Sequence, residues 1–312
     1  MAIKPRSALA RKLAFMGTQS AKTPKGADLA IFGAPHGTPY KTIDNRVHEK
    51  SPDAFRRVLK ADANWLSHWD WDFAGPLLPE GFKAVDLGNL ATKTKDGRNN
   101  RNKIRNATMA ILEAGAVPIM LGGDDSTPIP FIEGFAGSPP ITILQIDAHI
   151  DWRHEREKET MGFSSTMRRA SEQTHVWRIV QAGARGLGSA RFQEVQDARD
   201  WGVHFVTAKH IHHHGTASVL DHIEPDSHCV ICLDLDVLDV SIMPAVAYPS
   251  PGGLAFQQLT DLIEGVAAKA HIAGFAMVEF VPKRDLANTA AFTAARLVCH
   301  AMARSARNKR PS

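Results

Sequence analysis

The sequence predicts one three-layer α/β/α domain built on a mainly parallel β-sheet. From residue 27 onwards, short apolar runs alternate with longer amphipathic stretches, and Gly-, Asp- or Pro-rich breaks separate the two. This strand–helix alternation is typical of parallel sheets that helices cover on both sides. Most of the apolar runs are continuous rather than alternating, which indicates strands buried on both faces.

Eight apolar runs are predicted to form the strands, in the order ADLAIFGAP (27–35), KAVDLGNL (83–90), VPIMLGGDD (117–125), ITILQIDAH (141–149), VWRIVQAGA (176–184), VHFVTA (203–208), CVICLDLD (229–236) and IAGFAMVEF (272–280). Helices are predicted between and after them at 99–114, 189–201, 255–269 and 289–304. Ser189 is a candidate N-cap for the second of these helices, and Gly115 and Gly202 lie just past two helix ends.

Length and composition fit a single globular unit. At 312 residues the chain is near the upper size for one hydrophobic core, with 44% hydrophobic and 22% charged residues. Two smaller domains would also fit the length, but no internal repeat, low-complexity tract or interdomain linker divides the sequence. We therefore predict one catalytic domain over 27–303.

The positive charge is concentrated at the two ends. The formal net charge is +4, yet 1–26 and 304–312 together hold ten basic residues and no acidic one, which leaves −6 for the rest. The basic residues are Lys4, Arg6, Arg11, Lys12, Lys22, Lys25, Arg304, Arg307, Lys309 and Arg310. We expect a flexible basic N-terminal arm (1–26), a basic tail (304–312) and no nucleic-acid partner, because no aromatic residues interleave with a basic patch.

Cysteines and hydropathy point to a cytoplasmic protein. Cys229, Cys232 and Cys299 are too few for a disulfide framework, and the C-x-x-C pair lies inside an apolar run, where core packing is expected. No apolar stretch approaches the ~18 residues of a membrane span. The basic N-terminus faintly resembles a transit peptide but lacks the apolar core of a secretory signal.

Acidic residues gather where the predicted strands end. One run ends in Asp147, His149 and Asp151, and another ends in Asp234 and Asp236. A third ends in Gly122-Gly123 followed by Asp124 and Asp125. Ligands bind at the carboxyl ends of parallel strands, and buried carboxylates repel one another unless cations neutralise them. A single acid at a strand end often only caps the next helix, but three such ends favour a site for two divalent cations.

These segments resemble the metal motifs of the ureohydrolase (arginase/agmatinase) family. The three motifs are D-A-H-I-D (147–151), D-L-D-V-L-D (234–239) and G-G-D-D-S (122–126). The resemblance covers roughly 27–303 and is greatest to the agmatinase-like branch. Further matching segments follow in the expected order: GAPHGTPY (33–40), VDLGNL (85–90), MRRASE (167–172), ARGLGSAR (184–191), PGGL (251–254) and GFAMVEFVPKRD (274–285).

The resemblance implies an arginase-like fold and a small cationic guanidino substrate. It also implies two divalent metal ions, manganese in the first place and nickel as the alternative, with a hydroxide between them that attacks the guanidinium carbon. Asp151 would orient the hydroxide, and Glu279 would pair with the substrate. Relatives commonly form trimers or hexamers. Carried over by motif, the metal ligands are Asp147, His149, Asp151, Asp234 and Asp236.

Two positions depart from the family pattern. Asp125 replaces the histidine of the usual G-G-D-H-S, so it either binds a metal as a carboxylate, which would favour manganese, or points away and leaves one site weak. A His-Gly of many relatives, whose histidine is a candidate proton shuttle, is here Met161-Gly162. His36 and His154 are candidates to take its place at the substrate, or are ordinary polar loop residues.

Three further polar segments are expected to form loops. The histidines at 210 and 212–214 are expected on a solvated loop, since no acidic residues accompany them. The charged loops 42–50 and 152–160 are expected to set specificity without revealing the substrate.

The sequence thus predicts an amidinohydrolase that cleaves agmatine, a guanidino acid, guanidine or a biguanide. A non-catalytic or weakly active subunit that supports an active homologue in a hetero-oligomer is the alternative, motivated by the two lost histidines. A deacetylase on the related fold would need a catalytic tyrosine, and neither Tyr40 nor Tyr248 lies in a matching motif.

Overall fold

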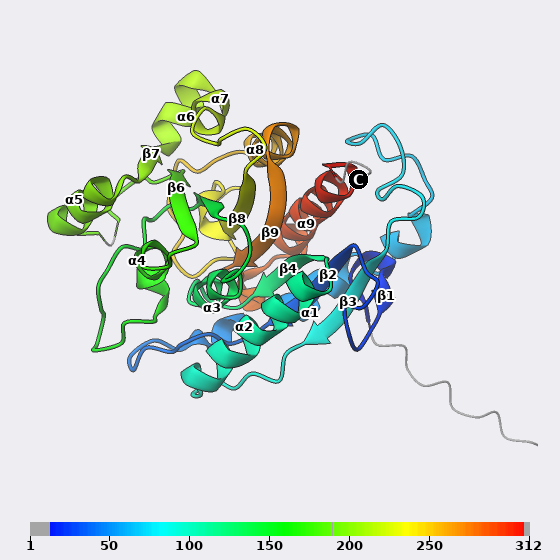
Figure 1. Cartoon of the computed structure of the whole chain (residues 1–312), viewed down its shortest axis with the longest axis horizontal. Helices are drawn as coiled ribbons and strands as arrows, with labels where there is room; N and C mark the ends of the chain where they lie inside the picture. Colours follow the sequence, from blue (N-terminus) through cyan, green and yellow to red (C-terminus); the bar gives the residue numbers. More distant parts are fainter. Residues whose placement is uncertain (1–12, 189, 309–312) are drawn as a thin grey trace, which may run out of the picture.

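The computed structural model describes residues 13–188 and 190–308, and within them the chain forms one parallel sheet (Figure 1). The sheet has nine strands in the order β1-β3-β2-β4-β9-β8-β5-β6-β7, and every ladder is parallel. The strands are β1 (Gln19–Ser20), β2 (Leu29–Ala34), β3 (Ala84–Asn89), β4 (Val117–Gly122), β5 (Ile141–Ile146), β6 (Val176–Ala182), β7 (His204–Val206), β8 (His228–Asp234) and β9 (His271–Val278).

All eight predicted strands are confirmed, and the two-residue β1 is the one that the sequence analysis missed. The helices are α1 (Ser51–Val58), α2 (Gly97–Glu113), α3 (Pro128–Glu133), α4 (Thr166–Ser171), α5 (Phe192–Trp201), α6 (Ala208–His214), α7 (Ala217–Leu220), α8 (Phe256–Lys269) and α9 (Thr289–Asn308). The four predicted helices correspond to α2, α5, α8 and α9. The others are too short to show a helical period in sequence.

Helices cover both faces of the sheet, which confirms the three-layer architecture (Figure 1). On one face α1, α8 and α9 pack against β2, β4 and β9. On the other face α2 packs against β4 and α4 against β6, and α3 packs against both of these helices. Two apolar cores result, one on each side of the sheet. Cys229 lies in the first core and Cys232 in the second, and both are free and buried, as predicted.

Packed structure continues past both predicted ends of the domain. Within the expected flexible arm, Phe15 is fully buried, and its backbone N–H donates a 2.8 Å hydrogen bond to Asp86. Residues 1–12 lie outside the described part of the chain. At the other end α9 continues to Asn308 because its apolar face continues, with Ala306 buried and Arg304 paired to Glu264 at 2.8 Å.

Two smaller points concern α5 and membranes. Helix α5 begins at Phe192 with Arg191 as its N-cap, and the proposed cap Ser189 lies outside the described residues. None of the helices in the described ranges combines the length and the apolar character needed to cross a bilayer.

Candidate metal centre and substrate cavity

The four central strands deliver the acidic residues to one place. β4, β9, β8 and β5 are consecutive neighbours in the sheet, and all run in the same direction. Their carboxyl ends therefore lie side by side at one edge of the sheet. The acids just past these ends are Asp125 after β4, Glu279 after β9, Asp234 and Asp236 at β8, and Asp147 and Asp151 after β5.

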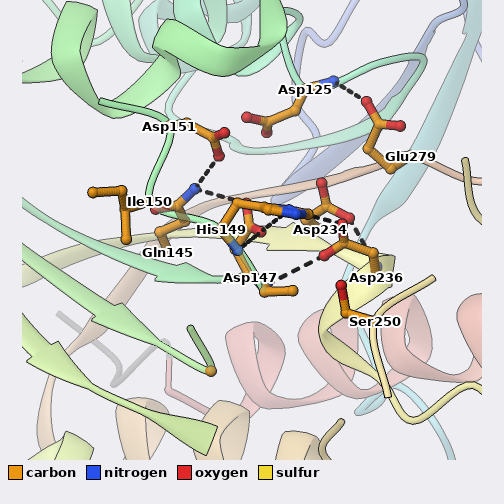
Figure 2. Close-up of polar contacts among 12 residues, drawn as sticks. Asp125, Gln145, Asp147, His149, Ile150, Asp151, Asp234, Asp236, Ser250 and Glu279 are labelled. Atoms are coloured by element: carbon orange, nitrogen blue, oxygen red, sulfur yellow. Dashed lines mark hydrogen bonds and ion pairs between the residues drawn. The ribbon is translucent and has the colours of Figure 1, made fainter. Parts of the chain in front are cut away.

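Two groups of potential metal ligands form there and share one residue (Figure 2). Asp147, His149 and Asp236 place their ligand atoms within 4.8 Å of one another, and so do Asp125, Asp147 and Asp151. Asp147 thus belongs to both groups. Asp234 lies beside them and accepts a 2.8 Å hydrogen bond from the backbone N–H of Asp236. The five ligands predicted from the motifs, which are Asp147, His149, Asp151, Asp234 and Asp236, therefore lie close together with Asp125, and their binding of metal stays a prediction.

Two of these acids sit in a backbone conformation that is unusual for non-glycine residues. Asp151 has φ 43° and Glu279 has φ 69°, both in the left-handed region. Such strain persists where surrounding contacts impose it, most often at functional sites. Here the carbonyl of Asp151 accepts from the N–H groups of Met167 and Arg168, and the N–H of Glu279 donates to the carbonyl of Gly123. The backbone therefore aims both carboxylates into the site.

A buried glutamine braces two of the carboxylates at the end of β5, those of Asp147 and Asp151. The Nε2 of Gln145 donates to Asp147 and to Asp151, at 2.8 Å each. Gln181 holds Gln145 in turn and also donates to the carbonyl of Ile150 at 2.8 Å. Neither glutamine was predicted as a site residue, although a polar residue inside an otherwise apolar strand is a usable signal.

The electrostatics of the cluster favour bound cations. Burial raises the pKa of Asp125, Asp151 and Asp234 well above the ordinary value, and the neighbouring carboxylates raise it further. Burial lowers the pKa of His149, but Asp147 and Asp236 outweigh this effect and raise it to about 12. The Oδ2 atom of Asp125 is buried without a hydrogen-bond partner. The cluster therefore offers carboxylate oxygens and one imidazole, and one of these oxygens has no hydrogen-bond partner. This donor set fits two hard divalent cations.

Glu279 is held from two sides. Its Oε1 accepts a 2.8 Å hydrogen bond from the backbone N–H of Asp125, and its Oε2 lies 3.3 Å from Nε2 of His48. The other ring nitrogen of His48 lies 2.8 Å from the carbonyl oxygen of Phe280. Burial raises the pKa of Glu279 to about 7, although His48 opposes this shift. His48, in the loop expected to set specificity, is a supporting residue that the sequence analysis did not single out.

A cavity of about 450 Å³ opens above the cluster. Its floor carries the acids and His149, and its wall combines aromatic and aliphatic side chains with one arginine. The predicted specificity loop 152–160 supplies that arginine, Arg156, whereas loop 42–50 does not line this cavity. The lining residues are Asp125, His149, Asp151, Arg156, Phe163, Ser164, Leu187, Gly188, Asp234, Asp236, Ala247, Tyr248, Pro249, Ser250 and Glu279.

The remaining candidate histidines lie away from the cavity wall. The ring of His36 contacts Thr92 at 2.9 Å and Glu49 at 3.6 Å, and His154 is exposed. The structure gives neither of them a place among the lining residues. The histidines at 210 and 212–214 are solvent-exposed, as expected, but they form helix α6 rather than a loop, because Thr207 caps its first turn.

Potential metal ligands and a cavity at the strand ends of a parallel α/β/α fold are the arrangement expected of a metal-dependent hydrolase. Comparison with known proteins agrees: the profile of the arginase family matches residues 27–303. The chain therefore belongs to the arginase family, as its motifs predicted. As a member, it is a hydrolase that acts on non-peptide C–N bonds in linear amidines.

Individual relatives cover most of the chain. An N(1)-aminopropylagmatine ureohydrolase from Thermococcus kodakarensis is 27% identical over 80% of this chain and 82% of its own length. The solved structure of the proclavaminate amidino hydrolase from Streptomyces clavuligerus has a TM-score of 0.81 at 24% identity, covering 96% of this chain and 98% of that one. The agmatine ureohydrolase of Thermoplasma volcanium has a TM-score of 0.75 at 25% identity, covering 92% of each chain.

Proposed function

We propose that this protein is a two-metal amidinohydrolase that releases urea, or a urea-like fragment, from a guanidino compound. The observation that carries the proposal is the position of Glu279, which lines the same cavity as the two ligand groups that share Asp147. A buried carboxylate there suits the planar guanidinium cation, which can donate two parallel hydrogen bonds to it. The candidate substrates are agmatine, a guanidino acid, guanidine itself and a biguanide.

The metal ligands we propose are the six residues at the strand ends, and the ions are manganese, with nickel as the alternative. Bound cations would neutralise the carboxylates and lower the pKa of a water molecule in the site. Gln145 orients two of the ligands, as hydrogen-bonding partners outside a metal site generally do. Five carboxylates and one imidazole form a mainly oxygen donor set, which favours manganese. The set is Asp125, Asp147, His149, Asp151, Asp234 and Asp236.

We assign the steps of the reaction to individual groups of this chain. Glu279 binds the guanidinium, while His48 and the N–H of Asp125 hold its carboxylate in place. Asp151 accepts the proton of the attacking water as the oxygen bonds to the guanidinium carbon. The bond from that carbon to the substituted nitrogen breaks, and this nitrogen receives the proton. The second proton of the water follows to the same nitrogen, so the products are neutral urea and an alkylammonium ion, and the single positive charge is conserved.

One observation favours the alternative function, a weakly active or non-catalytic subunit. Among the described residues, His149 is the one histidine that lines the cavity, and we assign it to the metal centre. No histidine in the described cavity wall is therefore left to act as the proton shuttle. In this alternative the chain would support an active homologue in a hetero-oligomer, whereas the main proposal expects a homo-oligomer, a trimer or hexamer, in solution.

A screen for urea release tests the proposal. The purified protein, loaded separately with manganese and nickel, is incubated with each candidate substrate, and the metal content is measured in parallel. We expect about two metals per chain and urea from at least one compound. Full metal loading with no urea from any of them contradicts the main proposal and supports the alternative.

Glu279→Gln gives a second test within the same assay. Because it removes the negative partner of the substrate but leaves the metal ligands in place, we expect unchanged metal content and a loss of roughly 100-fold or more in kcat/KM. Glu264→Gln, which alters a surface ion pair with Arg304, serves as the control and should keep wild-type activity. Unchanged turnover in Glu279→Gln would mean that Glu279 only packs.

A further inference from the structure

In the described part of the cavity wall, Arg156 is a cation whose hydrogen-bonding capacity is unused. Within the described part of the chain, the guanidinium of Arg156 makes no hydrogen bond, and its ion pair there is a long one, 3.7 Å from Nε to Oε1 of Glu157. The side chain is one-third exposed, at 33%. An arginine carries five N–H donors in a planar fork that matches a carboxylate. Arg156 therefore presents a carboxylate-binding group to the cavity.

Other arginines near the site are used differently. Arg185 donates to the backbone carbonyls of Ser250 and Asp236, and Arg284 donates to the carbonyl of Val246. Both of these side chains therefore hold the loops around the cavity together. Among the residues that the structure describes, Arg156 has no such acceptor, so a purely structural role leaves its donors unexplained.

Aromatic packing holds Arg156 in place. The carbon of its guanidinium lies 5.2 Å from the ring centre of Tyr40 and 5.9 Å from that of Phe163. The Phe163 ring in turn packs edge-on against Tyr40, with the ring centres 4.9 Å apart. Cation–π contacts of this kind orient a guanidinium while its N–H edge stays available.

The loop that carries Arg156 is also anchored. The carboxylate of Glu157 accepts hydrogen bonds from the backbone N–H of Thr42, at 3.0 Å, and from its hydroxyl. The backbone N–H of Arg156 donates to the carbonyl of Glu159 at 3.0 Å, which closes a tight turn. A pre-positioned cation loses little conformational entropy when it binds an anion.

We infer that Arg156 binds a carboxylate at the far end of the substrate, so that the preferred substrate is an ω-guanidino carboxylate. The inference rests on the proposed function, since it presumes that Glu279 binds the guanidinium at the other end. The cavity then offers the carboxylate of Glu279 to the cationic end of one small molecule and the guanidinium of Arg156 to its anionic end. A second cation, such as the terminal ammonium of agmatine, would face like charge at Arg156.

Two substrates of matched length test the inference. A carbon chain of similar length separates the guanidino group from a terminal carboxylate in 4-guanidinobutanoate and from a terminal ammonium in agmatine. With the metal-loaded protein we expect kcat/KM at least about 10-fold higher for 4-guanidinobutanoate. Arg156→Gln should raise KM for this compound about 10- to 100-fold with little change in kcat, and should leave agmatine unaffected or improved. The kcat/KM values for guanidinoacetate and 3-guanidinopropanoate show how activity depends on the length of the substrate's carbon chain.

Lys158→Gln is the matched control. It removes the same charge from the same loop, but Lys158 is exposed and does not line the cavity. The control should keep the wild-type ratio between the two substrates. If agmatine is hydrolysed at least as well as 4-guanidinobutanoate and Arg156→Gln leaves the ratio unchanged, the carboxylate subsite is refuted while the amidinohydrolase proposal stands.

A binding measurement separates the two proposals when no urea is released. The thermal unfolding of metal-loaded wild type, Arg156→Gln and Lys158→Gln is followed with and without 4-guanidinobutanoate. A rise in melting temperature that Arg156→Gln abolishes and Lys158→Gln keeps supports the subsite even without turnover. The absence of any Arg156-dependent rise overturns it.

Discussion

Asp125 is the residue at which this chain departs from its family inside the candidate metal centre. Its backbone is fully engaged, because the N–H donates to Glu279 and the carbonyl accepts from the hydroxyl of Thr166. Its carboxylate, in contrast, groups with Asp147 and Asp151, and one of its oxygens is buried without a partner. An unpaired buried carboxylate is costly, which supports the prediction that Asp125 is a ligand rather than a side chain that points away.

Substitution of Asp125 by histidine should shift the pH dependence of activity. The change removes one negative charge from the cluster, and less negative charge makes it easier to deprotonate a water molecule there. We expect the rising limb of the activity–pH profile of Asp125→His to move to lower pH. The metal that supports turnover should also change towards nickel, because imidazole suits nickel better than a carboxylate does. Rate–pH profiles with each metal measure both effects.

The neighbouring Asp124 offers a control for these profiles. Its carboxylate is occupied by hydrogen bonds from Ser126 and from Asn45, at 2.5 and 2.9 Å, and it does not line the cavity. Asp124→Asn thus removes a nearby charge without changing the ligand groups. A profile that stays the same in Asp125→His, or that shifts equally in Asp124→Asn, would remove the case for ligation by Asp125.

Helix α9 illustrates how an element far from the site sets a pH limit on stability. His300 on this helix is buried, and its ring lies 4.9 Å from that of Phe73 and 5.8 Å from that of Phe256. Burial and the nearby Arg296 lower the pKa of His300 to about 4, although Asp72 opposes the shift. The folded protein therefore keeps this ring neutral, whereas the unfolded chain protonates it near the ordinary value of about 6.5.

The unfolded state thus binds the extra proton between these two pKa values, so His300 makes the protein less stable as pH falls from about 6.5 towards 4. Between pH 7.5 and 5.0 we expect this residue to account for a loss of about 2 kcal/mol in the free energy of unfolding. Urea denaturation of wild type and His300→Leu at both pH values tests this, with the exposed His213→Leu as control. An equal pH dependence in all three proteins would contradict it.

At the scale of the whole molecule, the sheet gathers acids from four of its strands, which makes stability depend on bound metal. In the absence of cations, burial and mutual repulsion oppose ionisation of several carboxylates, among them Asp151 and Asp234. Metal ions that bind the folded state alone stabilise it by mass action, by about 2.7 kcal/mol at a hundred times their dissociation constant.

Removal of metal by a chelator should therefore lower the melting temperature by roughly 5 °C or more, and added manganese should restore it. Asp147→Asn alters the residue that both ligand groups share, so this variant should respond to neither treatment. Calorimetry of the treated and untreated proteins gives the comparison. An identical melting temperature for wild type with and without chelator would exclude a metal centre that contributes to stability.

The order of elements and the residue types of the site follow from the sequence itself. Strands covered on both faces must be apolar throughout, so the eight runs were visible without long-range information. Acids just past the strand ends were visible for the same reason, since they interrupt the apolar pattern. Connections between parallel strands do not determine which strands become neighbours, so the adjacency of β4, β9, β8 and β5 was decided by tertiary packing. The structure likewise brought His48, Gln145 and Arg156 to the site through contacts between remote segments, which no local pattern encodes.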